Sequence, residues 1–292
     1  MLIPNFDAFV AIDWSGAARG YDGIAVAICR MGRTPPALVV PPRTRWTREE
    51  IAEWLKCRLG EGQRLLIGID FAFGFPYEGC GYLGGRAEGI EDIFALWDLI
   101  EAKSEGEADF GCTRFVSDPE YVHLFWKAGP KPERWVERKR RTEHACAEST
   151  KTRPDTLYKL LHSKQVGKAS ITGMRVLHHV RSRKGDCVAI WPFETPRCST
   201  IVEIYPTVFR KVATGSIAKL RSRDDLNQAL DVLRSRPMSE GNEVHLSDHE
   251  TDALISAAGL RSIASSPEVW TSPELTSPRV RREGWIFGIP AL

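Results

Sequence analysis

The sequence lacks the features of a disulfide-stabilised, membrane-spanning or secreted protein. Its seven Cys are odd in number and scattered without a CxxC pair, which argues against a disulfide scaffold and a structural zinc site. This cysteine usage favours a reducing compartment, the cytoplasm. No apolar run approaches the roughly 18–20 residues that a membrane helix needs, so we expect no membrane span. The first residues show no basic segment and no cleavage pattern, so we expect no secretion signal.

The chain also shows no internal repeat and no low-complexity tract. Its 292 residues are an ordinary globular mixture, 42% hydrophobic and 27% charged, with nine Trp and a net charge of +2. This composition excludes intrinsic disorder. The length suffices for one large domain or two small ones.

The small net charge conceals a separation of charge along the chain. Residues 131–184 hold 15 Lys and Arg against 5 Asp and Glu, whereas residues 78–120 hold 3 against 11. A basic stretch of this kind favours a polyanionic partner such as nucleic acid. The alternative is that the basic side chains form a solvated face and pair with the acidic stretch. The sequence leaves both interpretations open.

Apolar periodicity predicts an α/β fold. Strands are expected at 8–12, 23–28, 37–40, 65–69, 187–191 and 201–205. Helices are expected from Thr47, which forms a capping box with Glu50, to Gly60, and then at 206–213, 223–235 and 248–258. We interpret the chain as a single domain over 1–292 with a large inserted helical lobe at about 71–185, whose amphipathic stretches are 90–102 and 154–162.

Carboxylates end or interrupt three of the predicted buried strands. Asp13 closes the first strand, Asp70 closes the fourth, and Glu203 lies inside a later apolar run. A carboxylate at the edge of a hydrophobic sheet is unfavourable unless it is paired, protonated or bound to metal. One such residue is ordinarily a strand-end cap, but three together suggest a site.

The last long predicted helix adds a fourth carboxylate. Ser247 and Glu250 form a capping box, and Asp248 in the first turn suits the helix dipole. Asp252 has no such structural role. It stands in the second turn and shares a face with Asp248 and His249.

Clustered carboxylate oxygens select hard cations such as Mg²⁺ or Mn²⁺. The chemistry of a two-metal phosphodiesterase needs several acidic groups from separate elements, which is the pattern present here. The predicted metal ligands and catalytic residues are Asp13, Asp70, Glu203 and Asp252, with Asp248 as a weaker ligand and with Ser15 and His249 supporting them.

The same residues carry a resemblance to a known family. The motifs are Ala11–Gly16, Gly68–Pro76, Val202–Pro206 and Thr251–Leu254. Together they resemble the family called domain of unknown function 429, whose members are described as predicted nucleases, and the likeness runs from about residue 8 to Trp285. The resemblance implies a ribonuclease H-like mixed sheet flanked by helices. It also implies that Asp13 is the central metal ligand and that Asp70, Glu203 and Asp252 complete the acidic cluster.

The leading hypothesis is therefore a metal-dependent nuclease or phosphodiesterase acting on nucleic acid. Basic residues of the insertion would hold the phosphate backbone, namely Arg138, Lys139, Arg140, Arg141, Lys159, Lys164 and Lys168. One alternative is a non-catalytic nucleic-acid-binding or scaffold protein on the same fold. A second is a relative of actin-like ATPases and sugar kinases, whose phosphate loop the Asp-x-Ser-Gly sequence after the first strand resembles. The sequence leaves open whether the substrate is DNA, RNA or a small nucleotide, and it leaves the oligomeric state open.

Overall fold

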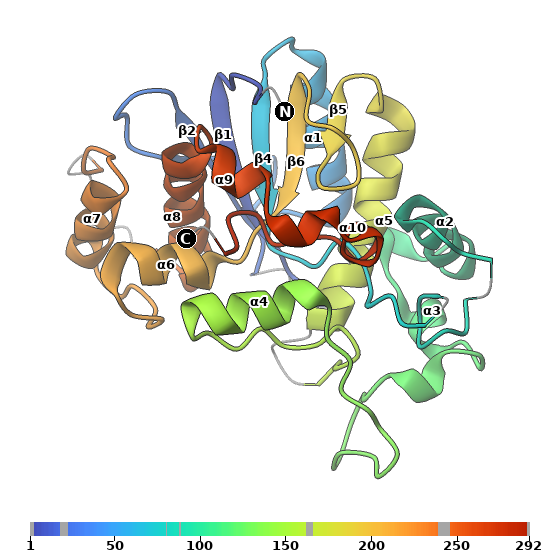
Figure 1. The fold of residues 1–292 in the computed structure, drawn as a ribbon. Coiled ribbons are helices and arrows are strands. Elements are labelled where there is room, and N and C mark those ends of the chain that lie inside the picture. The colour runs from blue at the N-terminus through green and yellow to red at the C-terminus, as the bar shows by residue number, and fades with distance from the viewer. Residues whose placement is uncertain are drawn as a thin grey trace.

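Six strands form one mixed sheet in the computed structural model, which describes residues 3–17, 23–79, 81–87, 89–161, 166–238 and 246–290. The strands are β1 (Ala8–Asp13), β2 (Ala25–Arg30), β3 (Ala37–Leu38), β4 (Leu65–Ile69), β5 (Val188–Ile190) and β6 (Ser199–Glu203). Their order across the sheet is β3-β2-β1-β4-β6-β5 (Figure 1). The pairs β1–β2 and β2–β3 are antiparallel, and the remaining pairs are parallel. The predicted α/β fold, with helices flanking a sheet, is confirmed.

Helices flank this sheet and fill the long connection between β4 and β5. They are α1 (Arg48–Gly60), α2 (Ile93–Lys103), α3 (Thr113–Ser117), α4 (Arg141–Thr150), α5 (Val166–Lys184), α6 (Pro206–Thr214), α7 (Arg223–Val232), α8 (Asp248–Ile263), α9 (Pro267–Trp270) and α10 (Pro278–Glu283). Short 3₁₀ turns lie at Ala108–Phe110, Val122–Leu124 and Pro273–Thr276. None of the described helices combines the length and apolar character that a membrane crossing requires.

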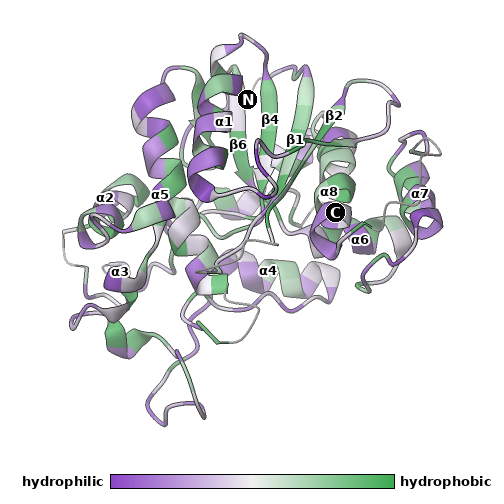
Figure 2. Cartoon of the chain, turned by 180° about the vertical axis from the view of Figure 1, so that it is seen from behind, coloured by the Kyte–Doolittle hydropathy of each residue, from purple (hydrophilic) through white to green (hydrophobic). Residues whose placement is uncertain are grey.

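Alternation along the strands divides the core between the two faces of the sheet. In β1, Val10 and Ile12 pack in the core with α1 and α5, whereas Phe9 and Ala11 pack in the core with α8. Because strand side chains alternate between faces, the nearly continuous apolar run of β1 is buried on both sides. Hydrophobic colour accordingly concentrates on the central strands in Figure 2.

The connection between β4 and β5 differs in two respects from the predicted helical lobe. Its last helix, α5, packs against α1 and α2 and belongs to the layer that covers the sheet. The predicted amphipathic stretch at 154–162 forms no helix in its described part. Thr156 instead donates its hydroxyl to Arg138 O and its backbone N–H to the Asp155 carboxylate, and such side-chain bonds compete with helix formation. Helix α4 lies across the end of the sheet at which β4 and β6 finish (Figure 1).

Helix α5 holds the loops that follow β1 and β4. Trp14 Nε1 donates to Thr172 Oγ1 at 3.3 Å, and Ala72 N donates to Ser170 Oγ at 3.1 Å. Gly173 makes the approach possible, because a Cβ there would lie 2.4 Å from the Phe71 ring. One helix therefore holds the residues that follow both Asp13 and Asp70.

Replacing Gly173 by alanine is expected to lower the free energy of unfolding by about 1–3 kcal/mol, because the added methyl displaces a buried ring and overpacks the core. Gly60→Ala is the matched control, since Gly60 also lies in a helix and its Cβ would meet the flexible end of Lys184 at 3.3 Å. The control is expected to keep or slightly raise stability. Urea denaturation followed by circular dichroism measures both, and equal stability of the two variants would contradict the close packing described for Gly173.

Candidate active site

Asp13 and Asp70 lie at the same level on neighbouring parallel strands. Ile12 pairs with Ile69, and Asp70 N donates to Ile12 O at 2.9 Å just beyond that pair. Each aspartate is one residue further along its strand, so both side chains point to the face of the sheet that α8 covers. Asp13 is buried and Asp70 is partly buried. The structure therefore brings together the two carboxylates that the sequence placed at strand ends.

Helix α8 adds His249 and Asp252 to this face. The predicted capping box is present, since Ser247 Oγ accepts from Glu250 N and Glu250 Oε2 accepts from Ser247 N. This cap sets the start of the helix so that His249 Nδ1 lies 2.5 Å from Asp13 Oδ2. His249 is thus in direct contact with a predicted ligand. Asp248 points elsewhere and forms an exposed ion pair with Arg221.

Asp13 and Asp70 both resist ionisation. Burial raises the pKa of Asp13, and repulsion from Asp252 adds to this, while the hydrogen bond from His249 opposes it. Burial also raises the pKa of Asp70 well above its usual range, followed by repulsion from Asp13 and Asp252. The hydrogen bond to Asp13 raises the pKa of His249. In the described part of the chain, the Asp70 side chain has no hydrogen bond and no ion pair.

Asp252 is buried and lies between two cationic side chains. Its Oδ1 pairs with the Arg210 guanidinium from α6, and its Oδ2 lies 2.5 Å from Lys219 Nζ. The same Lys219 ammonium lowers the pKa of Asp13 and of Asp70 by its charge. Arg210 and Lys219 were not predicted as part of the site, because they lie 42 and 33 residues before Asp252 in the sequence.

Glu203 belongs to a different cluster, on the other side of the sheet end. It pairs with Ile69 rather than with Asp70, so it points to the face opposite that of Asp13 and Asp70. There it accepts from Arg140 at 2.5 and 2.8 Å and from Phe73 N at 3.0 Å. Glu203 therefore has a buried cationic partner.

Arg140 was predicted to bind phosphate, which requires an accessible side chain. In the structure it is buried, with only 1% of its surface exposed. Its guanidinium also donates to Glu143 at 2.5 and 2.8 Å and to Glu283 O at 3.1 Å. Burial raises the pKa of Glu143, and Arg140 opposes this by its charge. A guanidinium enclosed by these acceptors is not presented to a nucleic-acid backbone.

Three of the six other basic residues predicted to hold phosphate are paired with nearby acids. Arg138 contacts Glu78 at 2.9 Å, Lys139 contacts Glu137 at 3.3 Å, and Lys159 contacts Asp155 at 2.7 Å. Of these pairs, that of Arg138 reaches the acidic stretch at 78–120, whereas Glu137 and Asp155 lie within the basic stretch itself.

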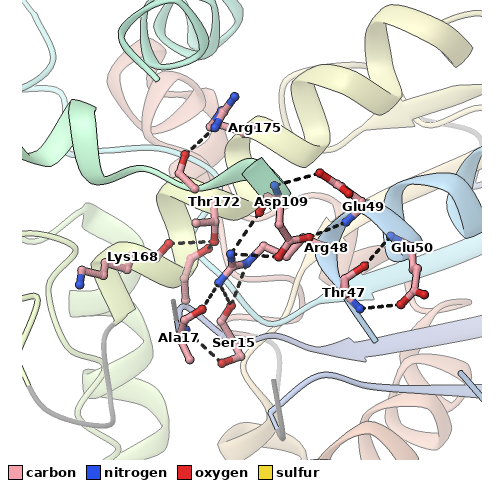
Figure 3. A network of polar contacts seen from close by, with 12 residues as sticks. Ser15, Ala17, Thr47, Arg48, Glu49, Glu50, Asp109, Lys168, Thr172 and Arg175 are labelled. Carbon is pink, nitrogen blue, oxygen red and sulfur yellow. Dashed lines mark hydrogen bonds and ion pairs between the residues drawn. The ribbon is translucent and has the colours of Figure 1, made fainter. Parts of the chain in front are cut away.

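Three predicted basic residues remain. Arg141 is exposed and Lys168 is partly exposed, with its side chain directed away from the polar network of Figure 3. Lys164 lies outside the residues that the structure describes.

Ser15 lies two residues after Asp13, in a loop that Arg48 holds from α1. The Arg48 guanidinium donates to Ser15 O at 3.1 and 3.2 Å and to Ala17 O at 2.6 Å (Figure 3). It also donates to Asp109 O at 3.2 Å, which joins the loop to the connection between β4 and β5. Arg48 is buried, which the sequence did not predict. Ser15 thus contributes its backbone to the loop's position.

A cavity of about 210 Å³ lies beside the carboxylates. Asp70, His249 and Ser15 border it from one side, and Arg140 and Glu203 border it from the other. Aromatic and aliphatic side chains, including Trp14 and Tyr205, share the rest of its wall with Glu143, Asp155 and Ser170. A small polar group entering this cavity meets both the Asp70 carboxylate and the exposed part of the His249 ring.

The donors present suit an ion such as Mg²⁺ that keeps several of its waters, rather than an ion held by protein ligands alone. Among the described residues, no three His, Cys, Asp or Glu side chains form a group that could hold a metal ion. Mg²⁺, however, usually binds proteins through one or two carboxylates and keeps several waters. Asp13 and Asp70 supply such a pair, and a cation would offset the burial and the repulsion that raise the pKa of both. Glu203 and Asp252 already have cationic partners, so the four predicted carboxylates do not act as one ligand set here.

Comparison of the chain with protein-family models, with curated proteins and with solved structures finds no match.

Proposed function

We propose that this protein is a divalent-metal-dependent phosphodiesterase that hydrolyses nucleic-acid phosphodiester bonds on a ribonuclease H-like sheet. The observation that carries the proposal is the pair of carboxylates, Asp13 and Asp70, at the same level of neighbouring strands. Both resist ionisation, and Asp70 has no cationic contact in the described part of the chain. Support for nucleic acid as the substrate comes from the motif resemblance, because its motifs include half of the residues that line the cavity.

Asp13 and Asp70 would hold the cation, which supplies positive charge that acidifies water and polarises the phosphoryl oxygen. His249 is placed to move a proton. Asp13 Oδ2 accepts from Nδ1, so Nε2 carries the lone pair of the neutral ring and can accept a proton from the attacking water. The hydrogen bond to Asp13 also fixes the orientation of the ring.

Calorimetric titration with Mn²⁺ is expected to show saturable binding by the wild type. Asp13→Asn should weaken the affinity for Mn²⁺ by more than 10–100-fold. That range is typical of losing a residue that only hydrogen-bonds to a metal ligand, whereas Asp13 is expected to be a ligand itself. Asp248→Asn is the matched control, because this carboxylate lies on the same helix end as His249 but pairs with Arg221 at the surface. Wild-type protein that is folded and binds no Mn²⁺ would refute the proposal. Cleavage is then measured on bis(p-nitrophenyl) phosphate and on single-stranded, branched and hybrid nucleic acids.

A non-catalytic nucleic-acid-binding or scaffold protein is the second candidate, and one observation favours it. Glu203 and Asp252 are both neutralised by basic side chains without any metal. In that case the acidic residues would serve the fold. Salt-dependent binding of nucleic acid, with no Mn²⁺ binding and no hydrolysis, is the result that distinguishes this function from the phosphodiesterase.

A further inference from the structure

The ion pairs of Asp252 distinguish this site from the four-carboxylate arrangement that the sequence predicts. Arg210 and Lys219 approach different oxygens of the same carboxylate, so one acidic group is matched by two cationic ones. Asp252 is 4% exposed, and its charge is therefore held in a largely desolvated place. A divalent ion that used Asp252 as a ligand would have to displace at least one of these partners or share the carboxylate with it.

The connection between α6 and α7 holds Lys219 in position. Gly215 ends α6 in the left-handed conformation at φ 71°, and Thr214 Oγ1 accepts from Ser216 N at 3.1 Å. Ser216 Oγ in turn accepts from Ala218 N at 3.1 Å, and Leu220 is buried on the far side of Lys219. The lysine side chain is 34% exposed and so reaches solvent as well as Asp252.

The two cations differ in what they can still bind. Arg210 is buried and its terminal nitrogens are directed at Asp252 and Thr207. Lys219 has three N–H groups, and one of them is directed at Asp252. In the part of the chain that the structure describes, the other two remain for oxygens of a bound ligand. Lys219 is therefore the one of these two cations that keeps N–H groups for a ligand.

The ion pairs of Asp252 limit the carboxylates that are open to a divalent ion. Asp252 has a cationic group on each of its oxygens. The Asp70 side chain, in contrast, has no hydrogen bond and no ion pair among the described residues, and Asp13 lies beside it on the neighbouring strand. Asp13 and Asp70 therefore remain as the pair of carboxylates for a single ion.

We propose that the site takes one divalent cation, between Asp13 and Asp70, and that the Lys219 ammonium group supplies the second positive charge by contacting oxygens of the substrate phosphate. This inference rests on the proposed function and names a catalytic residue for it. Lys219 would stabilise the charge that develops on those oxygens as water attacks and the ester bond breaks. Asp252 keeps the ammonium group in position, and Arg210 keeps Asp252 in position.

The test compares the wild type with Lys219→Met, Lys219→Arg and Arg221→Met. Arg221 is the matched control because it lies two residues away, carries the same charge and contacts Asp248 rather than Asp252. Mn²⁺ stoichiometry is measured by calorimetry on protein alone, and hydrolysis is measured with bis(p-nitrophenyl) phosphate. Thermal unfolding of each metal-free variant establishes that it is folded.

We expect one Mn²⁺ per chain in the wild type, in Lys219→Arg and in Arg221→Met. Lys219→Met frees one oxygen of Asp252 and should acquire a second, weaker Mn²⁺ site. Its kcat at a Mn²⁺ concentration that fills only the first site should fall by roughly 10²-fold or more, as for loss of one charge-stabilising donor.

Two ions per chain in the wild type, with the same titration in Lys219→Met, would overturn the inference and leave the phosphodiesterase proposal intact. Unchanged stoichiometry and unchanged kcat in Lys219→Met would also overturn it. Absence of any Mn²⁺ binding in the wild type would instead overturn the proposed function, and the inference with it.

Discussion

Replacing Arg140 by methionine is expected to lower the free energy of unfolding by about 3–5 kcal/mol, because it leaves the carboxylates of Glu143 and Glu203 buried without their cation. The three side chains are at most 3% exposed, so solvent cannot replace the guanidinium. A loss of this size is a large part of the 5–15 kcal/mol that stabilises a typical domain. Urea denaturation followed by tryptophan fluorescence measures it.

A triple variant separates charge from packing. Arg140→Met combined with Glu143→Gln and Glu203→Gln removes the uncompensated charges and should recover much of the lost stability. Arg138→Met is the control, since this neighbouring arginine forms a partly exposed pair with Glu78 and should change stability by no more than about 1 kcal/mol. If Arg140→Met is as stable as Arg138→Met, the buried ionic cluster is not formed as described. If Glu203→Gln alone abolishes Mn²⁺ binding, Glu203 is a metal ligand and not the counter-ion of Arg140.

Replacing Asp70 by asparagine is the second substitution with a large expected effect. It should raise the stability of the protein and abolish its phosphodiesterase activity. The pKa of Asp70 is raised mainly by burial, so the folded protein binds this proton more tightly than the unfolded chain does. The resulting destabilisation is absent below the ordinary aspartate pKa of 3.8 and grows as the pH rises toward the raised value. Asparagine is neutral throughout this range. The variant should therefore be more stable near pH 7 by about 1–3 kcal/mol, and its stability should depend less on pH.

Thermal unfolding between pH 4 and pH 8, with and without Mn²⁺, measures both sides of this prediction. Mn²⁺ should raise the melting temperature of the wild type and have little effect on Asp70→Asn, because ligand binding stabilises only a protein that binds it. Phosphodiester hydrolysis should be lost. Asp186→Asn, at an exposed position, is the control and should stay within about 0.5 kcal/mol of the wild type. A variant that is less stable than the wild type near pH 7 would show that Asp70 is a structural carboxylate.

Local chemistry made much of the fold predictable. The apolar runs of β1, β4 and β6 identify strands because such runs are buried on both faces, and the boundaries agree within about two residues. The Thr47–Glu50 and Ser247–Glu250 capping boxes are both formed, since each depends on residues three apart. The stretch at 154–162 was mispredicted as amphipathic structure because its turn-forming bonds reach back to Arg138, beyond any local window.

The sequence by itself determined that Asp13 and Asp70 end buried strands, because hydrophobic runs locate the strands and a carboxylate ends each run. It also determined that His249 and Asp252 share the start of a helix. Only the tertiary structure decided which carboxylates share a face. Glu203 pairs with Ile69, the residue before Asp70. Because successive side chains of a strand point to opposite faces of the sheet, this shift of one residue places Glu203 on the face opposite Asp13 and Asp70.

The tertiary structure also decided which acids have cationic partners. Arg140 reaches Glu203 over 63 residues, and Lys219 reaches Asp252 over 33. Pairing over such separations depends on how helices and connections pack at the end of the sheet, and periodicity and local motifs carry no information about it. The sequence could therefore locate the carboxylates of the candidate site, whereas their ionisation depends on charges that only folding brings beside them.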